Sequence, residues 1–323
     1  MLMSIFKKKQ TLSDLLHIII DNPNMVPVTE MKQAIQQLRI AMSLITQPTV
    51  EVENFMKLFF QTNAFVTLMS ILDRLDFDAR KDIATILSFF VRRKMSGEAT
   101  KLDDPSPLLE FIRLKPQIIT QIVQRLTTPD QALTYGQILQ DMSKSRQLTE
   151  IILTFLQSEN FTHLFEAMGS NEFDVSSEAC ILLKELLTKH QSLTQQFLSD
   201  NPEFLTHFLS MVSVNNYATR RFVLQMIGDL LLNKENFEAM LQFVKSDANL
   251  RHVMQALRDQ TVTIRQEAFH IFKIFVACPD KEETVLRILK KNKDKLIQFL
   301  DELKVSQENE DEKQYIIDEL KKL

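Results

Sequence analysis

The fold is decided by four similar segments: FDARKDIATIL (77–87), FDVSSEACILL (173–183), YATRRFVLQMI (217–227) and VTIRQEAFHIF (262–272). Each has a short polar start followed by apolar residues at helical spacing. The last three begin 44 and 45 residues apart. A looser copy, PDQALTYGQIL (129–139), fits when Ile138 is aligned with Ile181, 43 residues later. A period in the low to middle forties is typical of HEAT and armadillo units.

Such a unit buries its apolar face only by stacking on its neighbours. The repeat therefore predicts an all-α, right-handed helical-repeat solenoid of armadillo or HEAT type, curved and with a concave partner-binding face. The chain has only 4 Gly, too few for the tight turns of a many-stranded sheet. We expect one domain over 1–323, with an extended loop near 95–107, a short acidic linker at 306–312 and a terminal helix at 313–323.

Charge and composition exclude several classes of protein. The 323 residues carry a formal net charge of -4, which argues against electrostatic binding to nucleic acid or a membrane surface. Two cysteines cannot form a disulfide framework or a structural zinc site. At the N-terminus the basic residues follow the apolar ones, the reverse of a secretory signal. The apolar stretch 58–72 is too short to span a bilayer. A soluble, cytoplasmic protein is expected.

Catalytic and metal-binding patterns are weak. His270 follows Glu267 by one helical turn, a pair that can ligate a metal, but a di-metal bundle needs two such pairs and no second one occurs. Because Phe269, Ile271 and Phe272 surround His270, a core or interface histidine is the better interpretation. The acidic run 308–312 lacks the pattern of a calcium loop. We expect no enzyme activity, no cofactor and no metal.

Basic side chains suggest a binding surface instead. The span 281–300 holds six basic and three acidic residues, and Lys291 and Lys295 share one helix face. An apolar rim from Met254 would complete a pocket for a peptide with a carboxylate and aromatic rings. A solvated basic face explains the same charges. Arg220 and Arg221 begin a repeat helix, where cations oppose the helix dipole, so either an external anion or an acidic neighbour would account for them.

Longer strings resemble the calcium-binding protein 39 family, whose members are Mo25-like armadillo-type kinase scaffolds. They include RDQTVTIRQEAFHIFKIFVACPDK (258–281), LLNKENF (231–237), NLRHVMQALRD (249–259) and LTKHQ (187–191). LDFDARKDIATIL, SPLLEFI near Pro107 and the terminal DEKQYI (311–316) add to them. The similarity runs in order from about Phe6 to Leu323 and is strongest after Phe173.

The resemblance implies a non-catalytic scaffold. Family members bind the sterile-twenty-like pseudokinase of a tumour-suppressor kinase complex, as well as active germinal-centre-type kinases. They hold the kinase αC helix in its active position and take a Trp-Glu-Phe peptide into a C-terminal pocket. The expected state is a monomer that joins a hetero-complex. A general helical-repeat adaptor for cargo or cytoskeletal assembly, without kinase activation, is the alternative.

The resemblance also implies partner-binding residues. The kinase-facing basic and aromatic positions match Arg221, Lys234 and Phe237, and the pocket positions match Met254 and Lys291, with Lys295 beside it. For Met254 and Phe237, ordinary core packing between repeats is the competing interpretation.

Some positions depart from the family pattern. Gln225 stands where animal members have a Lys, and Lys234 replaces an Arg, so a bidentate contact is lost. The loop 95–107 is longer than usual, and Lys7–Lys9 replace a glycine-containing start. These departures bear on which kinase is bound.

Overall fold

The computed structural model describes residues 10–323 apart from 22, 48, 93–106, 158–160 and 305–309. All regular secondary structure in this described part is helical. The chain divides into two compact units. Unit 1 comprises 1–167 and 172–189, and unit 2 comprises 168–171 and 190–323.

Unit 1 contains α1 (Leu12–Ile20), α2 (Val28–Ser43), α3 (Val50–Gln61), α4 (Ala64–Ser70), α5 (Phe77–Arg92), α6 (Pro107–Leu114), α7 (Gln117–Arg125), α8 (Pro129–Met142), α9 (Arg146–Phe155), α10 (Phe161–Met168) and α11 (Phe173–Thr188). Unit 2 contains α12 (Gln191–Asp200), α13 (Phe204–Ser210), α14 (Tyr217–Leu232), α15 (Phe237–Lys245), α16 (Asp247–Ala256), α17 (Val262–Ala277), α18 (Glu283–Glu302) and α19 (Glu310–Lys322). The all-α helical-repeat prediction is confirmed, whereas the curvature and the concave face remain predictions.

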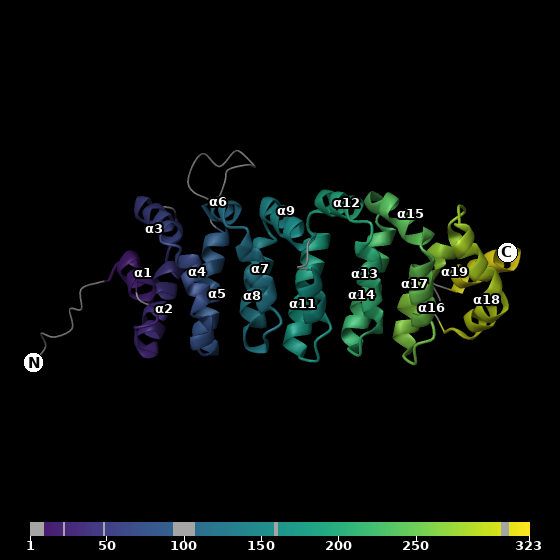
Figure 1. The fold of residues 1–323 in the computed structure, drawn as a ribbon, viewed down its shortest axis with the longest axis horizontal. Helices are drawn as coiled ribbons and strands as arrows, with labels where there is room; N and C mark the ends of the chain where they lie inside the picture. Colours follow the sequence, from purple (N-terminus) through teal and green to yellow (C-terminus); the bar gives the residue numbers. More distant parts are fainter. Residues whose placement is uncertain (1–9, 22, 48, 93–106, 158–160, 305–309) are drawn as a thin grey trace, which may run out of the picture. The chain divides into compact units, whose positions relative to one another are not determined.

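The repeat helices of unit 1 pack in succession. Helix α2 contacts α5, α5 contacts α8, and α8 contacts α11, so the four run side by side (Figure 1). Helices α5 and α11 begin at Phe77 and Phe173, which are the first residues of two sequence repeats. Each layer therefore repeats one structural unit. The starts of α2, α5, α8 and α11 are 49, 52 and 44 residues apart, so the spacing in unit 1 is wider than the 43-to-45-residue period except between α8 and α11.

The core of unit 1 follows from the spacing of apolar residues along α5. Its fully buried side chains are Ile83, Ile86, Leu87 and Phe90, which follow one another at steps of three, one and three residues and so share one helix face. The ring of Phe90 stacks on that of Phe59 from α3, with centroids 3.8 Å apart. Truncating one such buried aromatic typically costs about 3–5 kcal/mol.

Unit 2 fixes the start of its first repeat helix by hydrogen bonds. Asn216 caps α14, because its Oδ1 accepts from the backbone N–H of Ala218 (3.0 Å) and of Thr219 (3.3 Å). The Asn216 side-chain amide donates to the carbonyl of Ser170, and the Thr219 hydroxyl donates to that of Met168. Helix α14 then packs along α17, the next repeat helix. These contacts hold the N-terminal turn of α14, which carries Arg220 and Arg221.

The first residue of each repeat helix points away from the core. Phe77 is 61% exposed and Phe173 is 74% exposed, and Tyr217 and Val262 are exposed as well. The repeats thus place large apolar side chains on the surface at one end of each helix, where they are available to a partner.

The starts of α19 and α6 can be compared with the two segments that we expected to be a linker and a loop. Helix α19 begins at Glu310, three residues before the predicted terminal helix, so the predicted linker 306–312 is partly wrong. Glu310, Asp311 and Glu312 form its first turn, where carboxylates favour the positive end of the helix dipole. The predicted loop at 95–107 lies outside the described residues except for Pro107, which begins α6.

No single helix of the described chain is long and apolar enough to cross a membrane. Residues 50–61 and 64–74 meet the length and composition criteria only as a pair bent by 62°. Their largest apolar side chains, among them Phe55, Phe59 and Phe65, are buried in unit 1.

Candidate partner-binding site

All six residues predicted to bind a partner lie in unit 2. Arg221 is on α14, Lys234 is on a short 3-10 helix (Lys234–Asn236), and Phe237 begins α15. Met254 is on α16, and Lys291 and Lys295 are on α18. The structure places them at three separate positions, which are described in turn.

The first position is a pocket beside Met254, with a volume of about 680 Å³. Met254 is partly exposed there rather than buried in the core. The pocket is lined by Arg220, Arg251, Met254, Gln255, Arg258, Asp259, Gln260, Thr261, Ile288 and Asn292. Three guanidinium groups and one carboxylate thus surround an apolar patch. We call this the Met254 pocket.

Two of the three arginines already have acidic partners. Arg220 forms an ion pair and hydrogen bond with Asp259. Burial alone would raise the pKa of Asp259, but hydrogen bonds from Thr261 and the charge of Arg220 outweigh it and hold that pKa below its usual value. Arg251 pairs with Asp247, one turn earlier on α16, at 3.2 Å. Both charges are therefore compensated before any ligand binds.

Arg258 differs from these two. Its backbone N–H donates to the carbonyl of Gln255, but its exposed guanidinium has no ion pair within the described part of the chain. It lies one turn after Met254 and lines the same pocket. A guanidinium in this state can receive a carboxylate in a bidentate contact without first giving up a partner.

Lys291 and Lys295 are exposed on α18, and neither lines the Met254 pocket directly. Their neighbours Ile288 and Asn292 supply the α18 side of the lining. Lys291 follows Ile288 by three residues, and Lys295 follows Asn292 by three, so both lysines are near the helix face that borders the pocket. The two ammonium groups add positive charge at its edge.

The second position surrounds Arg221. Its Nε lies 3.6 Å from Oε1 of Glu267 on α17, and Gln225 donates to the same oxygen over 2.6 Å. An acidic neighbour therefore accounts for the cation at this helix start. Arg221 nevertheless keeps 46% of its side chain exposed. Lys234 is also exposed.

The third position surrounds Phe237, which is 55% exposed. Its ring borders a mostly apolar pocket of about 890 Å³ together with Leu232, Ile274 and Tyr315. This pocket and the Met254 pocket share no lining residue. Phe237 is therefore not simply part of the inter-repeat core. Whether it binds a partner remains a prediction.

Residues of the metal-binding type do not converge in the described chain. No group of three or more His, Cys, Asp and Glu side chains within it could hold a metal ion. The imidazole of His270 is half-buried, and burial together with the charge of Lys273 lowers its pKa, against weaker opposing effects of Glu267 and Glu312. Its surroundings are those of a neutral side chain packed between helices.

Sequence reasoning missed Arg251 and Arg258 as lining residues of the Met254 pocket. A signal was present, because 251, 254 and 258 are separated by three and four residues and so share one helical face. The four-residue step from Asp247 to Arg251 also indicates their ion pair. Local spacing could not show that Arg258 lies free of an ion pair in the described structure.

Comparisons with known proteins show which family the chain belongs to. A family model described as Mo25-like matches residues 7–323. The human protein named calcium-binding protein 39-like is 31% identical over 301 residues, which cover 92% of this chain and 86% of that protein. The Mo25-like protein of Schizosaccharomyces pombe is 30% identical over 94% of this chain and 92% of its own length. A designed armadillo repeat protein in complex with a (KR)4 peptide aligns over 82% of this chain with a TM-score of 0.46 and 11% identity. Because the family model and both relatives cover nearly the whole sequence, this chain belongs to the Mo25-like family.

Proposed function

We propose that this chain is a non-catalytic scaffold that binds a sterile-twenty or germinal-centre-type kinase or pseudokinase and holds its αC helix in the active position. Membership of the Mo25-like family supports a scaffold of the calcium-binding protein 39 type. The proposal includes a Trp-Glu-Phe-like C-terminal peptide of the partner, which binds in the Met254 pocket. The chain acts in the cytoplasm as a monomer that joins a hetero-complex.

The observation that carries the proposal is the composition of the Met254 pocket. An apolar side chain, an uncompensated guanidinium at Arg258 and the nearby ammonium groups of Lys291 and Lys295 suit a peptide with aromatic rings on either side of a carboxylate. The aromatic rings would bury apolar surface against Met254, and the glutamate would pair with Arg258. Burying two such rings contributes roughly 3–6 kcal/mol before the cost of ordering the peptide.

Activation follows from differential binding. An active kinase needs its Lys–Glu ion pair on αC and its metal-binding Asp in place together. A rigid scaffold that contacts only the αC-in state shifts the equilibrium by its difference in affinity for the two states. A shift from 1:99 to 99:1 requires about 5.5 kcal/mol. Arg221, Lys234 and Phe237 are exposed and are assigned to this kinase contact.

A general adaptor for cargo or cytoskeletal assembly is the second candidate. It would bind its partners through the exposed first residues of the repeat helices, such as Phe77 and Phe173, without activating a kinase. The two functions differ in their response to substitution. The scaffold requires Arg221 and Met254 for partner binding, whereas an adaptor of this kind keeps its partners when either is replaced.

The experiment that tests the pocket is fluorescence anisotropy with a labelled peptide ending in Trp-Glu-Phe, titrated with wild type and with Met254→Ala. We expect micromolar binding that the substitution weakens about tenfold, which corresponds to roughly 1.4 kcal/mol. Met240→Ala is the matched control, because Met240 lines the separate pocket that Phe237 borders. Equal binding by wild type and Met254→Ala would place the peptide elsewhere, and absent binding would remove the pocket from the proposal.

A further inference from the structure

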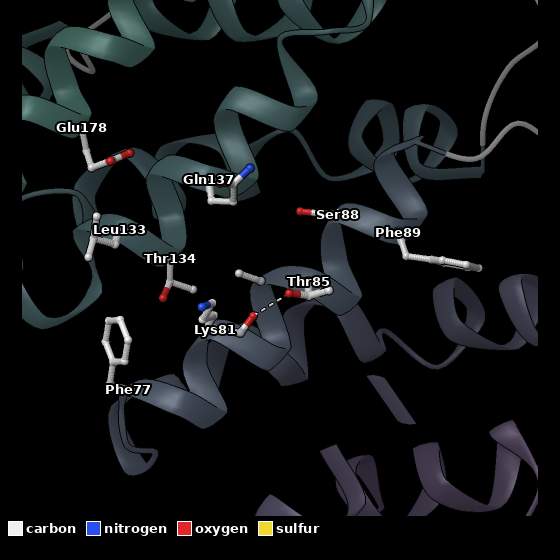
Figure 2. A pocket seen from close by; sticks show the side chains of 10 residues that line it. Phe77, Lys81, Thr85, Ser88, Phe89, Leu133, Thr134, Gln137 and Glu178 are labelled. Atoms are coloured by element: carbon white, nitrogen blue, oxygen red, sulfur yellow. Dashed lines mark hydrogen bonds between the residues drawn. The ribbon is translucent and has the colours of Figure 1, made fainter. Parts of the chain in front are cut away.

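A third pocket lies in unit 1, whereas the two pockets described above lie in unit 2. Its volume is about 670 Å³, and three consecutive repeat helices, α5, α8 and α11, supply its walls (Figure 2). The lining comprises Phe77, Lys81, Ala84, Thr85, Ser88, Phe89, Leu133, Thr134, Gln137 and Glu178. We call it the Glu178 pocket.

Apolar side chains stand open to solvent at this pocket. Phe77 is 61% exposed and Leu133 is 41% exposed, although both are large and apolar. They come from neighbouring helices that pack against each other. In Figure 2 both side chains lie on one side of the pocket. Together they form a patch that an apolar side chain of a partner would cover.

Some polar groups of the pocket are already engaged. The Ser88 hydroxyl donates to the fully buried carboxylate of Asp141, and the Gln137 amide donates to the same carboxylate over 3.1 Å. Lys144 forms an ion pair with Asp141. These bonds fix the inner wall of the pocket and satisfy a buried charge, so they explain Ser88 and Gln137 without a ligand.

Glu178 lacks such compensation. Its only hydrogen bond among the described residues comes from the Gln140 amide, 2.7 Å from Oε2, and no cation pairs with it there. Burial raises the pKa of Glu178, and the charge of Asp174, one turn earlier on α11, raises it further. The carboxylate packs over Gly136, since a Cβ at that position would lie 2.4 Å from Oε2. A cation from outside would relieve the cost of this partly buried charge.

Lys81 carries the opposite charge at the other side of the pocket. It is exposed and forms no ion pair within the described chain. Leu133 and Thr134 on α8 lie between Lys81 and Glu178 (Figure 2). Across α5, α8 and α11 the pocket therefore presents the cation of Lys81, the apolar side chain of Leu133 and the carboxylate of Glu178 in that order, with Phe77 one turn before Lys81 on α5.

We propose that the Glu178 pocket binds an extended peptide of a partner protein, in which an apolar residue lies between an acidic and a basic residue. The acidic side chain pairs with Lys81, the apolar side chain covers Phe77 and Leu133, and the basic side chain pairs with Glu178. The charge order of the pocket selects this occupant over a purely apolar or a uniformly charged segment.

The spacing within the peptide follows from helix packing. Adjacent packed helices lie about 8–10 Å apart, so α5 and α11 are separated by roughly 16–20 Å across α8. An extended chain advances about 3.3 Å per residue and its side chains alternate between two faces, so acidic and basic residues that both face the pocket are about six positions apart. Either chain direction satisfies this pattern, because side-chain contacts define it.

This site is independent of the proposed kinase contacts. Those contacts and the Met254 pocket belong to unit 2, whereas every residue of the Glu178 pocket belongs to unit 1. Substitutions at Lys81 or Glu178 should therefore leave binding of the Trp-Glu-Phe peptide unchanged. Failure of one proposal leaves the other standing.

The test uses pools of heptapeptides with Asp at the first position, Leu or Phe at the third, Arg at the seventh and random residues elsewhere. The reversed order forms a second pool. Matched pools carry Asn in place of Asp, Gln in place of Arg, or both replacements, and the last of these are the neutral pools. Immobilised full-length chain captures the peptides, which mass spectrometry quantifies. We expect wild type to retain the charged pools at least fivefold over the neutral ones.

Variants assign each charge to its partner. Glu178→Gln should abolish the preference for Arg over Gln, and Lys81→Gln should abolish the preference for Asp over Asn. Glu150→Gln and Lys57→Gln, at exposed positions of unit 1 outside the pocket, should keep both preferences. The proposal is overturned if wild type retains charged and neutral pools equally, or if either pocket variant keeps the preference that it should lose.

Discussion

Arg221 and Glu267 face each other from neighbouring repeat helices, with Nε of the first 3.6 Å from Oε1 of the second. At this distance the guanidinium makes a loose contact, and Gln225 holds the same carboxylate more closely. Arg221 can therefore turn to an external partner at little cost, because Glu267 retains a hydrogen bond. Arg221 is therefore expected to contribute little to the stability of the fold and much to binding of a partner.

Replacing Arg221 with Ala should affect binding far more than folding. Exposed ion pairs contribute about 0–1 kcal/mol, so we expect the free energy of unfolding to fall by about 0.5 kcal/mol or less. Binding to the partner kinase should weaken at least tenfold. Urea denaturation and a binding titration measure the two effects. Arg125→Ala, which removes an exposed ion pair with Asp73 in unit 1, is the matched control. A large loss of stability with unchanged binding would assign Arg221 to the fold.

Replacing Arg258 with Ala should weaken Trp-Glu-Phe peptide binding about tenfold, because its guanidinium is the one pocket arginine without an ion pair in the described chain. Arg251→Ala should cost threefold or less, since Asp247 already engages that side chain. The measurement is a double-mutant cycle with peptides ending in Trp-Glu-Phe and Trp-Gln-Phe. An equal loss for both peptides would show that Arg258 does not meet the glutamate.

The two helical glycines Gly228 and Gly136 should respond oppositely to substitution by alanine. A Cβ at Gly228 would meet nothing within 4 Å, so Gly228→Ala should raise the free energy of unfolding by about 0.5–1 kcal/mol. At Gly136 the Cβ would lie 2.4 Å from Oε2 and 3.2 Å from Cβ of Glu178, so Gly136→Ala should bring no gain. Thermal and urea unfolding compare them. Equal stabilisation by both would contradict the close approach of Glu178 to Gly136.

Tyr135 should make stability depend on pH in the alkaline range. Burial raises its pKa to about 12 from 10.0, and its hydroxyl donates to the Met69 carbonyl over 3.3 Å. Because the unfolded chain releases the phenolic proton first, stability falls as pH rises from about 10 towards 12. Relative to Tyr135→Phe, wild type should lose about 1 kcal/mol between pH 9 and pH 11, measured by urea unfolding. An equal change in the free energy of unfolding of the two proteins over this pH range would show that Tyr135 has the same pKa in the folded and unfolded states.

Much of the fold could be predicted from local patterns. The repeat segments that begin at Phe77, Phe173, Tyr217 and Val262 coincide with the starts of α5, α11, α14 and α17, because one period governs both sequence and packing. The start of α19 was misplaced, since carboxylates that resemble a solvated linker also suit the first turn of a helix.

The candidate site was less predictable. The sequence could place Met254 at a pocket and Lys291 near it. Which charged side chains of that pocket are already paired, however, depends on contacts between helices. Arg220 is neutralised by Asp259, which follows it by 39 residues, and no local spacing indicates that pair. For the same reason the Glu178 pocket was missed, because Lys81, Leu133 and Glu178 meet only through the stacking of three repeats.

Kinase activity as a function of added scaffold measures the proposed function most directly. Each sterile-twenty-type kinase domain of the source organism is titrated with wild type, Arg221→Ala and the control Arg125→Ala, with phosphate transfer to a generic substrate as the readout. We expect wild type and the control to raise the activity of at least one kinase tenfold or more, and Arg221→Ala to leave it unchanged. Unchanged activity of every kinase at saturating wild type, or equal activation by Arg221→Ala, would contradict the proposed function.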